Sequence, residues 1–378
     1  MKTKLTLILV IFLSYNAKII AQNSDDVLNL LIQKKLITET EADSLRADNA
    51  LKQQEQKEKQ KFFQILANKQ IQIGGYTQLR YQSFQEAGKP DGFDVRLARL
   101  DIKGNINPYW EYRLQTDFAG SPKIVDAYAA YKPFDFLKIT VGQLKVPLSP
   151  ENIAESSRLE SIDRSQVVEA LAARSKDVIG NQNGHDIGIQ ASGSVVKIKE
   201  RYLLDYYIAY LNGAGVNVSD NNESKDVAGR LVFHPFAGFD IGGAYYNGLD
   251  KFGTPAKDQQ RIRYAGEIAF TYKGANIKAE WIHGQDGIIQ REGWFAQATY
   301  FVWKRKVQLL AKYDTYDPNV IHLPDTSPTQ HDITTYYIFG ANYYFNDWVK
   351  LQVNYSYRQE QTKQINNDLI SAQVQISF

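Results

Sequence analysis

Charged side chains recur at every second position in several segments of the chain, and these are the residues whose types and spacing could do chemistry. In residues 110–118, Glu111, Arg113 and Asp117 share one parity, and residues 349–358 repeat the pattern. A strand places all residues of one parity on a single face. The buried face of a soluble sheet could not tolerate these charges, whereas the wall of a water-filled lumen can. The pattern therefore predicts weak electrostatic contacts with hydrated solutes.

Other patterns that could indicate catalysis or metal binding are weak. Glu280 and His283 have metal-ligand spacing but opposite strand parity, and residues 220–226 lack the glycine of a calcium loop. Ser192 and Ser194 lie at a strand end with no base implied nearby. We therefore expect no metal site, no cofactor and no enzymatic activity. The formal net charge of +2 carries no concentrated basic excess, so we expect no nucleic-acid partner.

Alternating strands must position these charges, and they run from Gln70 to the last residue. The segments of about ten residues number about sixteen, an even count of the size that leaves an aqueous channel. Tight turns such as 273–274 alternate with longer connections such as 212–224. Because short turns belong on the periplasmic side, both termini should be periplasmic. The sequence predicts an all-β fold, a transmembrane antiparallel β-barrel of about 16 strands.

Composition and the C-terminal strand support the same fold. The chain holds 24 Tyr, 18 Phe, 5 Trp and no Cys, with a mean hydropathy of −0.41. A barrel with interfacial aromatic girdles and a polar lumen has this combination. Ile370, Ala372, Val374, Ile376 and Phe378 form one face of the last strand. This ending looks like the assembly signal of bacterial outer-membrane proteins and predicts the outer membrane of a Gram-negative bacterium, with its lipid, as the location.

The first sixty residues differ from the rest. Residues 1–21 have the layout of a signal peptide, with cleavage after Ala21 or, as an alternative, after Ala17. Residues 22–61 are expected to form a periplasmic helical segment, in which Thr38 and Glu41 have capping-box spacing. Its end, residues 52–61, is either a solvated helix or a flexible linker. With about two heptads, self-association as a coiled coil stays open.

One connection of the barrel domain, residues 62–378, is much longer than the others. Residues 146–184 include Pro147, Pro150 and a helix-compatible run from Glu151 to Arg174. A connection of this length in a compact fold has structure and a role as a rule. Folded inward it would narrow the channel, and the alternative is an external loop that covers the mouth.

Four motifs in order carry a resemblance to a known family. They are Arg96-Leu97-Ala98-Arg99-Leu100 followed by Lys103-Gly104, then Gln115-Thr116-Asp117-Phe118, Asp126-Ala127-Tyr128, and Val141-Gly142-Gln143-Leu144-Lys145-Val146-Pro147. Together they resemble the phosphate-selective porin O and P family. The resemblance implies a sixteen-stranded homotrimer with a loop folded into the pore, and passage of small anions such as phosphate or pyrophosphate.

The resemblance also implies an anion-binding constriction. It would consist of Arg80, Arg96, Arg99, Arg113, Asp126 and Lys145. Guanidinium and ammonium groups donate charge-assisted hydrogen bonds to an oxyanion, and a carboxylate keeps the site weak enough to release it. Leu97 departs from the pattern because anion-selective members often carry arginine there. Water-facing charges are also nearly balanced, so a non-selective porin or a structural barrel is the alternative.

The parity of Arg96 and Arg99 conflicts within one strand. The two residues are three positions apart, so a regular strand would turn one of them toward lipid. Either one arginine faces lipid near the rim, or a β-bulge intervenes.

Overall fold

The computed structural model describes residues 20–67, 70–180, 183–321 and 332–378. The chain divides into two units, residues 1–69 and residues 70–378. Most of the expected signal peptide lies outside the described residues, and Ile20 and Ala21 belong to the first helix. Among the described residues, no helix combines the length and the apolar character needed to cross a lipid bilayer.

The first unit contains two helices, α2 (Ile20–Gln33) and α3 (Glu39–Ala67). The backbone N–H of Thr38 donates to Glu41 Oε2 at 2.8 Å, and the N–H of Glu41 donates to Thr38 Oγ1 at 3.3 Å, which is the reciprocal pattern of a capping box. Residues 52–61 are helical and continuous with the rest of α3. Because α3 continues through Ala67, the helical unit extends past the expected boundary at residue 61.

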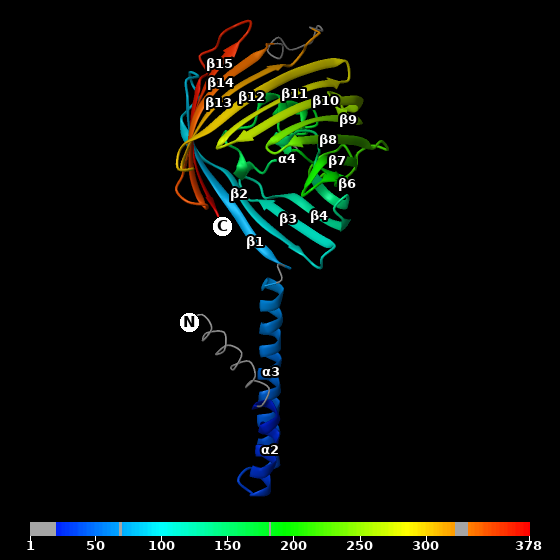
Figure 1. The fold of residues 1–378 in the computed structure, drawn as a ribbon, viewed down its shortest axis with the longest axis vertical. Helices are drawn as coiled ribbons and strands as arrows, with labels where there is room; N and C mark the ends of the chain where they lie inside the picture. Colours follow the sequence, from blue (N-terminus) through cyan, green and yellow to red (C-terminus); the bar gives the residue numbers. More distant parts are fainter. Residues whose placement is uncertain (1–19, 68–69, 181–182, 322–331) are drawn as a thin grey trace. The chain divides into compact units, whose positions relative to one another are not determined.

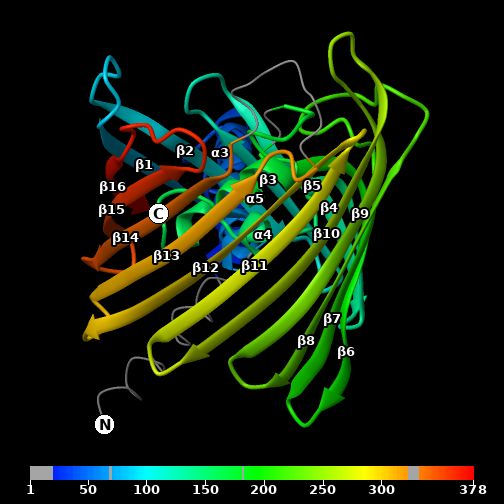
Figure 2. The same cartoon turned by 90° about the horizontal axis from the view of Figure 1, so that it is seen from above.

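The second unit is a closed antiparallel barrel of sixteen strands, which confirms the predicted fold class (Figures 1 and 2). Each strand pairs with its neighbours in sequence, and β1 pairs with β16. The strands are β1 (Gln72–Phe84), β2 (Gly92–Asn105), β3 (Trp110–Asp117), β4 (Lys123–Phe134), β5 (Leu137–Lys145), β6 (His185–Ile198), β7 (Arg201–Leu211), β8 (Asp226–Phe236), β9 (Phe239–Phe252), β10 (Lys257–Tyr272), β11 (Ala275–Asp286), β12 (Ile289–Trp303), β13 (Val307–Asp317), β14 (Thr334–Tyr344), β15 (Val349–Glu360) and β16 (Leu369–Ser377).

The barrel begins and ends at the same rim. Tyr76 of β1 lies opposite Ser377 of β16, and Gly75 and Phe378 exchange backbone hydrogen bonds of 3.0 Å. The short turns 237–238 and 273–274 lie at this rim. Most of the longer connections lie at the opposite rim, among them 212–225 and 361–368.

The two faces of each strand differ as the alternation requires. In β16, Ile370, Val374 and Ile376 are 36–48% exposed on the outer face, whereas Gln373 and Gln375 are buried on the inner face. Aromatic rings such as Trp281 and Trp294 are likewise exposed on the outer face. An apolar outer surface with aromatic residues suits a lipid environment, while polar inner residues line the lumen.

The connection 146–184, here called the long loop, lies inside the ring of strands, where Figure 2 shows α4 (Pro150–Ile153) and α5 (Gln166–Leu171). A 3₁₀ turn, η1 (Ser156–Arg158), lies between them. The helix-compatible run from Glu151 to Arg174 is thus broken into short pieces. Backbone groups that would be bonded within a helix are bonded to the barrel wall instead. The N–H of Ile162, for example, donates to Asn354 Oδ1 at 2.8 Å.

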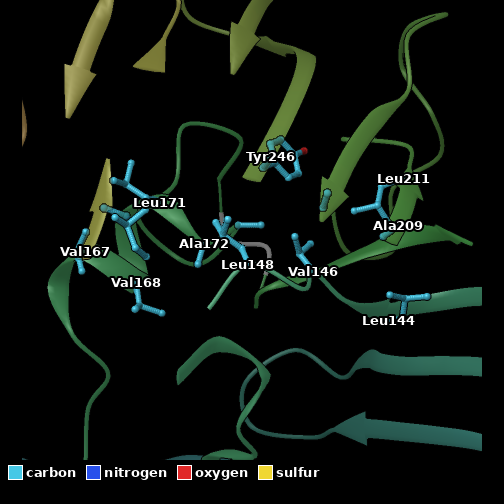
Figure 3. Close-up of a cluster of buried hydrophobic side chains, with 14 of the residues drawn as sticks. Leu144, Val146, Leu148, Val167, Val168, Leu171, Ala172, Ala209, Leu211 and Tyr246 are labelled. Carbon is cyan, nitrogen blue, oxygen red and sulfur yellow. The ribbon is translucent and has the colours of Figure 1, made fainter. Parts of the chain in front are cut away.

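Apolar side chains of the long loop pack against the wall. Leu148, Val167 and Leu171 are buried with Leu211 and Tyr246 of the wall, and Figure 3 shows this cluster. Burying one such side chain contributes roughly 1.5–3 kcal/mol. The long loop is therefore a packed part of the barrel interior.

Candidate functional site

A β-bulge brings both arginines of β2 into the lumen. The pairing of β1 with β2 shifts between Gln78 and Leu79, and Arg96 is the extra residue in β2. Arg96 Nη1 donates to Gln78 Oε1 at 2.7 Å, while Arg99, on the same face as Tyr76, lies next to Asp117 of β3. The bulge resolves the parity conflict between Arg96 and Arg99.

Arg80 and Arg96 share one carboxylate of the long loop. Asp163 Oδ1 lies 3.4 Å from Arg80 Nη1 and 3.2 Å from Arg96 Nη2. Arg80 also pairs with Asp94 through Nη2 at 2.6 Å. The side chain of Asp163 is 48% exposed, so this group faces water on one side. Both arginines thus have carboxylate partners within the protein.

Arg99 forms a separate, more buried contact. Its Nε lies 3.2 Å from Asp117 Oδ2, and its Nη1 donates to Gln115 Oε1 at 3.1 Å. The side chain is 4% exposed. Its guanidinium also lies 5.9 Å from the ring centre of Tyr76, within the range of a cation–π contact. Arg99 therefore stabilises the wall between β1 and β3.

The remaining three expected site residues meet where β3, β4 and β5 face the start of the long loop. Arg113 Nη1 lies 3.2 Å from Asp126 Oδ2 and 2.7 Å from Glu155 Oε1. Lys145 Nζ donates to the carbonyl oxygen of Ile153 at 2.7 Å and lies 3.6 Å from Glu155.

Two further contacts complete this group. Arg113 Nε lies 2.8 Å from Asp101 Oδ1, and Asp126 Oδ1 lies 3.2 Å from His185 Nε2. Three of the six expected residues thus form one group, Arg80 and Arg96 form another, and Arg99 stands apart from both.

Two charged groups of the long loop have pKa values below their ordinary values. Burial would raise the pKa of Glu155, but Lys145 and Arg113 outweigh it and lower the pKa. Burial, and then Arg174, lower the pKa of Arg164 to about 9. Glu155 therefore stays ionised at neutral pH and compensates the cations of β3 and β5.

A cavity at the short-turn rim holds a positive charge without a counter-charge. This mouth cavity has about 1150 Å³ of empty space, and Lys103, Arg113, Arg158 and Glu155 are among its lining residues. Arg158, the last residue of η1, is exposed and has no ion pair with any described residue. Lys103 lies 3.7 Å from Asp101, and its side chain is 54% exposed. These two residues can meet a passing anion without losing a buried partner.

Sequence reasoning did not identify several residues of this region as site residues. Glu155, Asp163 and His185 neutralise or orient the expected cations, and Arg158 lines the mouth cavity. The three residues of the long loop carry no spacing signal, because the path of the loop brings them to the wall, and His185 begins β6 directly after the loop. Within the described ranges, no cluster of three or more His, Cys, Asp or Glu residues could hold a metal ion.

The closed barrel with a charged lumen and an internal loop defines an outer-membrane channel of the porin type. Residues 67–246 match the model of the phosphate-selective porin O and P family, which confirms the resemblance seen in the motifs. No curated protein sequence matches the chain.

Solved structures with low sequence identity share the fold. OprB of Pseudomonas putida has a TM-score of 0.60 at 10% identity, over 84% of this chain and 96% of its own. The outer membrane channel DcaP of Acinetobacter baumannii has a TM-score of 0.58 at 13% identity, over 82% of this chain and 97% of its own. The trimer form of OmpT, an outer membrane protein of Vibrio cholerae, has a TM-score of 0.57 at 11% identity, over 82% of this chain and 99% of its own.

Proposed function

We propose that this protein lets small hydrophilic solutes diffuse passively across the outer membrane, with a modest preference for anions. The observation that supports the preference is the exposed Arg158, which has no ion pair with a described residue and lines the mouth cavity together with Lys103. The proposed function involves no catalytic step and no cofactor.

A non-selective porin is the second candidate, and one observation favours it. The cations expected to bind phosphate are paired within the protein: Arg99 with Asp117, and Arg113 with Asp126 and Glu155. A phosphate ion would have to replace these carboxylates before it could gain the full strength of the arginine donors. We therefore assign the preference to the mouth cavity and expect weak discrimination among anions.

Reversal potentials under a KCl gradient test the proposal, measured with the purified protein in planar bilayers. A single charge about 8 Å from the ion path contributes about 0.5 kcal/mol in water, or roughly a twofold permeability ratio. Arg158→Gln should move the reversal potential toward zero, whereas Lys257→Gln, in an exposed position at the opposite rim where β10 begins, should not. Cation selectivity of the unaltered protein, or an Arg158→Gln variant without effect, would reject the anion preference.

We also propose that the protein is a homotrimer with both termini in the periplasm. The trimer form of OmpT and the family resemblance support the trimer, and the shared rim of Gly75 and Phe378 supports a common side for the barrel ends. Chemical cross-linking in outer-membrane preparations should give a trimer band. A protease site placed after Phe378 should be cut only when the outer membrane is opened, and cleavage on intact cells would reverse the orientation.

A further inference from the structure

A second cavity opens from the lumen into the wall beneath the start of the long loop. This wall pocket has a cavity volume of about 190 Å³, which limits its occupant to a small solute. It shares Arg113, Tyr128 and Glu155 with the mouth cavity, so the two cavities adjoin. A solute in the lumen can therefore reach it.

The charges of the wall pocket are already compensated. Lys138 forms a close ion pair with Glu111, and Arg113 pairs with Glu155 and Asp126. Lys145 donates to two carbonyl oxygens of the long loop. A ligand with net charge would find no uncompensated counter-charge here, and it would pay for its own desolvation. The electrostatics therefore favour an uncharged ligand.

The remaining polar groups suit hydroxyl groups. Gln190 and Glu155 line the wall pocket, and Gln190 Oε1 and Glu155 Oε2 have no hydrogen-bond donor among the described residues. Both atoms are shielded from water, so a ligand hydroxyl reaches them only when these side chains turn toward the cavity. Acceptors of this kind are costly unless a donor is supplied. Thr140 and the tyrosine hydroxyls add groups that both donate and accept. A hydroxyl group can both donate a hydrogen bond to an acceptor and accept one from a donor. Neither a simple anion nor a simple cation can do both.

Aromatic and apolar groups of the wall pocket provide a second kind of contact for a ligand. Tyr128 and Tyr207 line the wall pocket together with Pro147 and Ile153 of the long loop. A pyranose ring has C–H groups on its faces and hydroxyl groups on its edge. Its faces can pack against the tyrosine rings while its edge meets the polar groups.

We propose that the wall pocket binds an uncharged polyhydroxylated solute of the size of a monosaccharide. The proposal depends on the proposed channel function only for the route by which the solute enters. It adds a solute class to a lumen whose mouth cavity prefers anions. In this account the wall pocket is a weak, saturable site on the diffusion path, since tight binding would prevent release.

Equilibrium dialysis of the full-length protein in detergent with radiolabelled D-glucose tests this directly and needs no ion conduction. We expect saturable binding with a Kd on the order of millimolar. Tyr207→Ala and Gln190→Leu should each weaken it roughly tenfold, because they remove a ring face and the amide partner. Tyr210→Ala is the matched control, since Tyr210 lies on the outer face of the same strand and is 54% exposed. The leucine variant nearly preserves side-chain size, and heat-modifiable gel mobility shows that each barrel is folded.

Other results of the dialysis experiment would overturn the proposal or separate it from the channel function. Absence of saturable glucose binding, or equal binding by the Tyr207, Gln190 and Tyr210 variants, would overturn the proposal. Displacement of glucose by millimolar glycine or inorganic phosphate would assign the wall pocket to zwitterionic or anionic solutes and would also overturn the proposal. If glucose binds but the protein conducts no ions in planar bilayers, the wall pocket stands and the channel function fails.

Discussion

At the scale of single residues, the lumen is a set of charges that mostly neutralise one another. Asp163 forms ion pairs with Arg80 and Arg96, and Glu155 forms one with Arg113. The selectivity of such a lumen depends on the few charges left over, because a paired charge presents little net field to a passing ion. Counter-charge residues should therefore control selectivity as strongly as the arginines themselves.

Removing the carboxylate of Asp163 should break its ion pairs with both Arg80 and Arg96. In Asp163→Asn, Arg96 loses its carboxylate partner and Arg80 keeps only Asp94. We expect anion permeability relative to cation permeability to rise roughly twofold, by the same Coulomb estimate as for one charge in water. Reversal potentials in planar bilayers measure the change, with Asp347→Asn, in the exposed turn between β14 and β15, as the control. A preference that stays the same or falls would show that these arginines do not face the ion path.

The attachment of the long loop should weaken in acid. Burial would raise the pKa of Glu151, but Lys312, Lys278 and hydrogen bonds from Ser165 outweigh it and lower the pKa to about 2. Because this pKa lies below the ordinary 4.5, the contact contributes fully above about pH 4.5 and is lost as the pH falls toward 2. Proteolysis of the long loop by pepsin, measured from pH 4.5 to 2, should accelerate over this range.

A variant identifies the contact responsible for the acid effect. Lys312 Nζ lies 3.1 Å from Glu151 Oε1, and both side chains are almost completely buried. Lys312→Met leaves the carboxylate without its cation, which costs about 3–5 kcal/mol in buried pairs. The variant should be cleaved faster than the unaltered protein already at pH 4.5. If its cleavage rate matches that of the unaltered protein at every pH, this ion pair does not attach the loop.

At the scale of elements, Gly142 shows where the wall depends on backbone shape. Gly142 in β5 has φ +128°, and an added Cβ would lie 2.2 Å from the carbonyl oxygen of Ala127. Gly142→Ala should destabilise the barrel by at least about 1–3 kcal/mol, the usual cost of a residue held in such a conformation. The midpoint of urea unfolding in detergent micelles measures the effect.

Gly229→Ala is the matched control for this prediction. Gly229 lies in β8, and an added Cβ would come no closer than 3.8 Å to the carbonyl oxygen of Tyr207. Its unfolding midpoint should stay close to that of the unaltered protein. Equal midpoints for Gly142→Ala and Gly229→Ala would contradict the strain assigned to β5.

The strands could be predicted from sequence because their signal is local. The alternating segments at residues 110–118 and 349–358 are β3 (Trp110–Asp117) and β15 (Val349–Glu360). A period of two, set by lipid on one side and water on the other, needs no knowledge of distant residues. The break in parity at Arg96 and Arg99 left two alternatives open, a lipid-facing arginine or a bulge, and the structure shows the bulge.

The contacts of the long loop could not be predicted, because they join residues far apart in the chain. Ser149 Oγ donates to Glu280 Oε2 at 2.5 Å across 131 positions, and Lys350 Nζ donates to the carbonyl oxygen of Leu159. These contacts decide which arginines are neutralised and why the run from Glu151 to Arg174 is not one helix. Residue type and spacing identified the cations of the lumen but not their partners.

At the scale of the whole molecule, the barrel is a closed ring of strands with the long loop inside it. Apolar burial around Leu148 and Leu171 and polar contacts to β11, β13 and β15 hold the long loop in place. The long loop reduces the open cross-section of the lumen. Its residues also line both the mouth cavity and the wall pocket. We therefore expect the long loop to limit passage through an otherwise wide barrel.

Single-channel conductance of a loop-deleted variant tests this claim most directly. Lys145 and His185 lie opposite each other in the β5–β6 ladder, so a short Gly-Ser linker can replace residues 149–182 without opening the wall. We predict that the unaltered protein conducts in planar bilayers and that the deletion raises its conductance severalfold, as expected for a sixteen-stranded barrel with an unobstructed aqueous lumen. Equal conductance of the two folded proteins, or no conductance from either, would contradict the account.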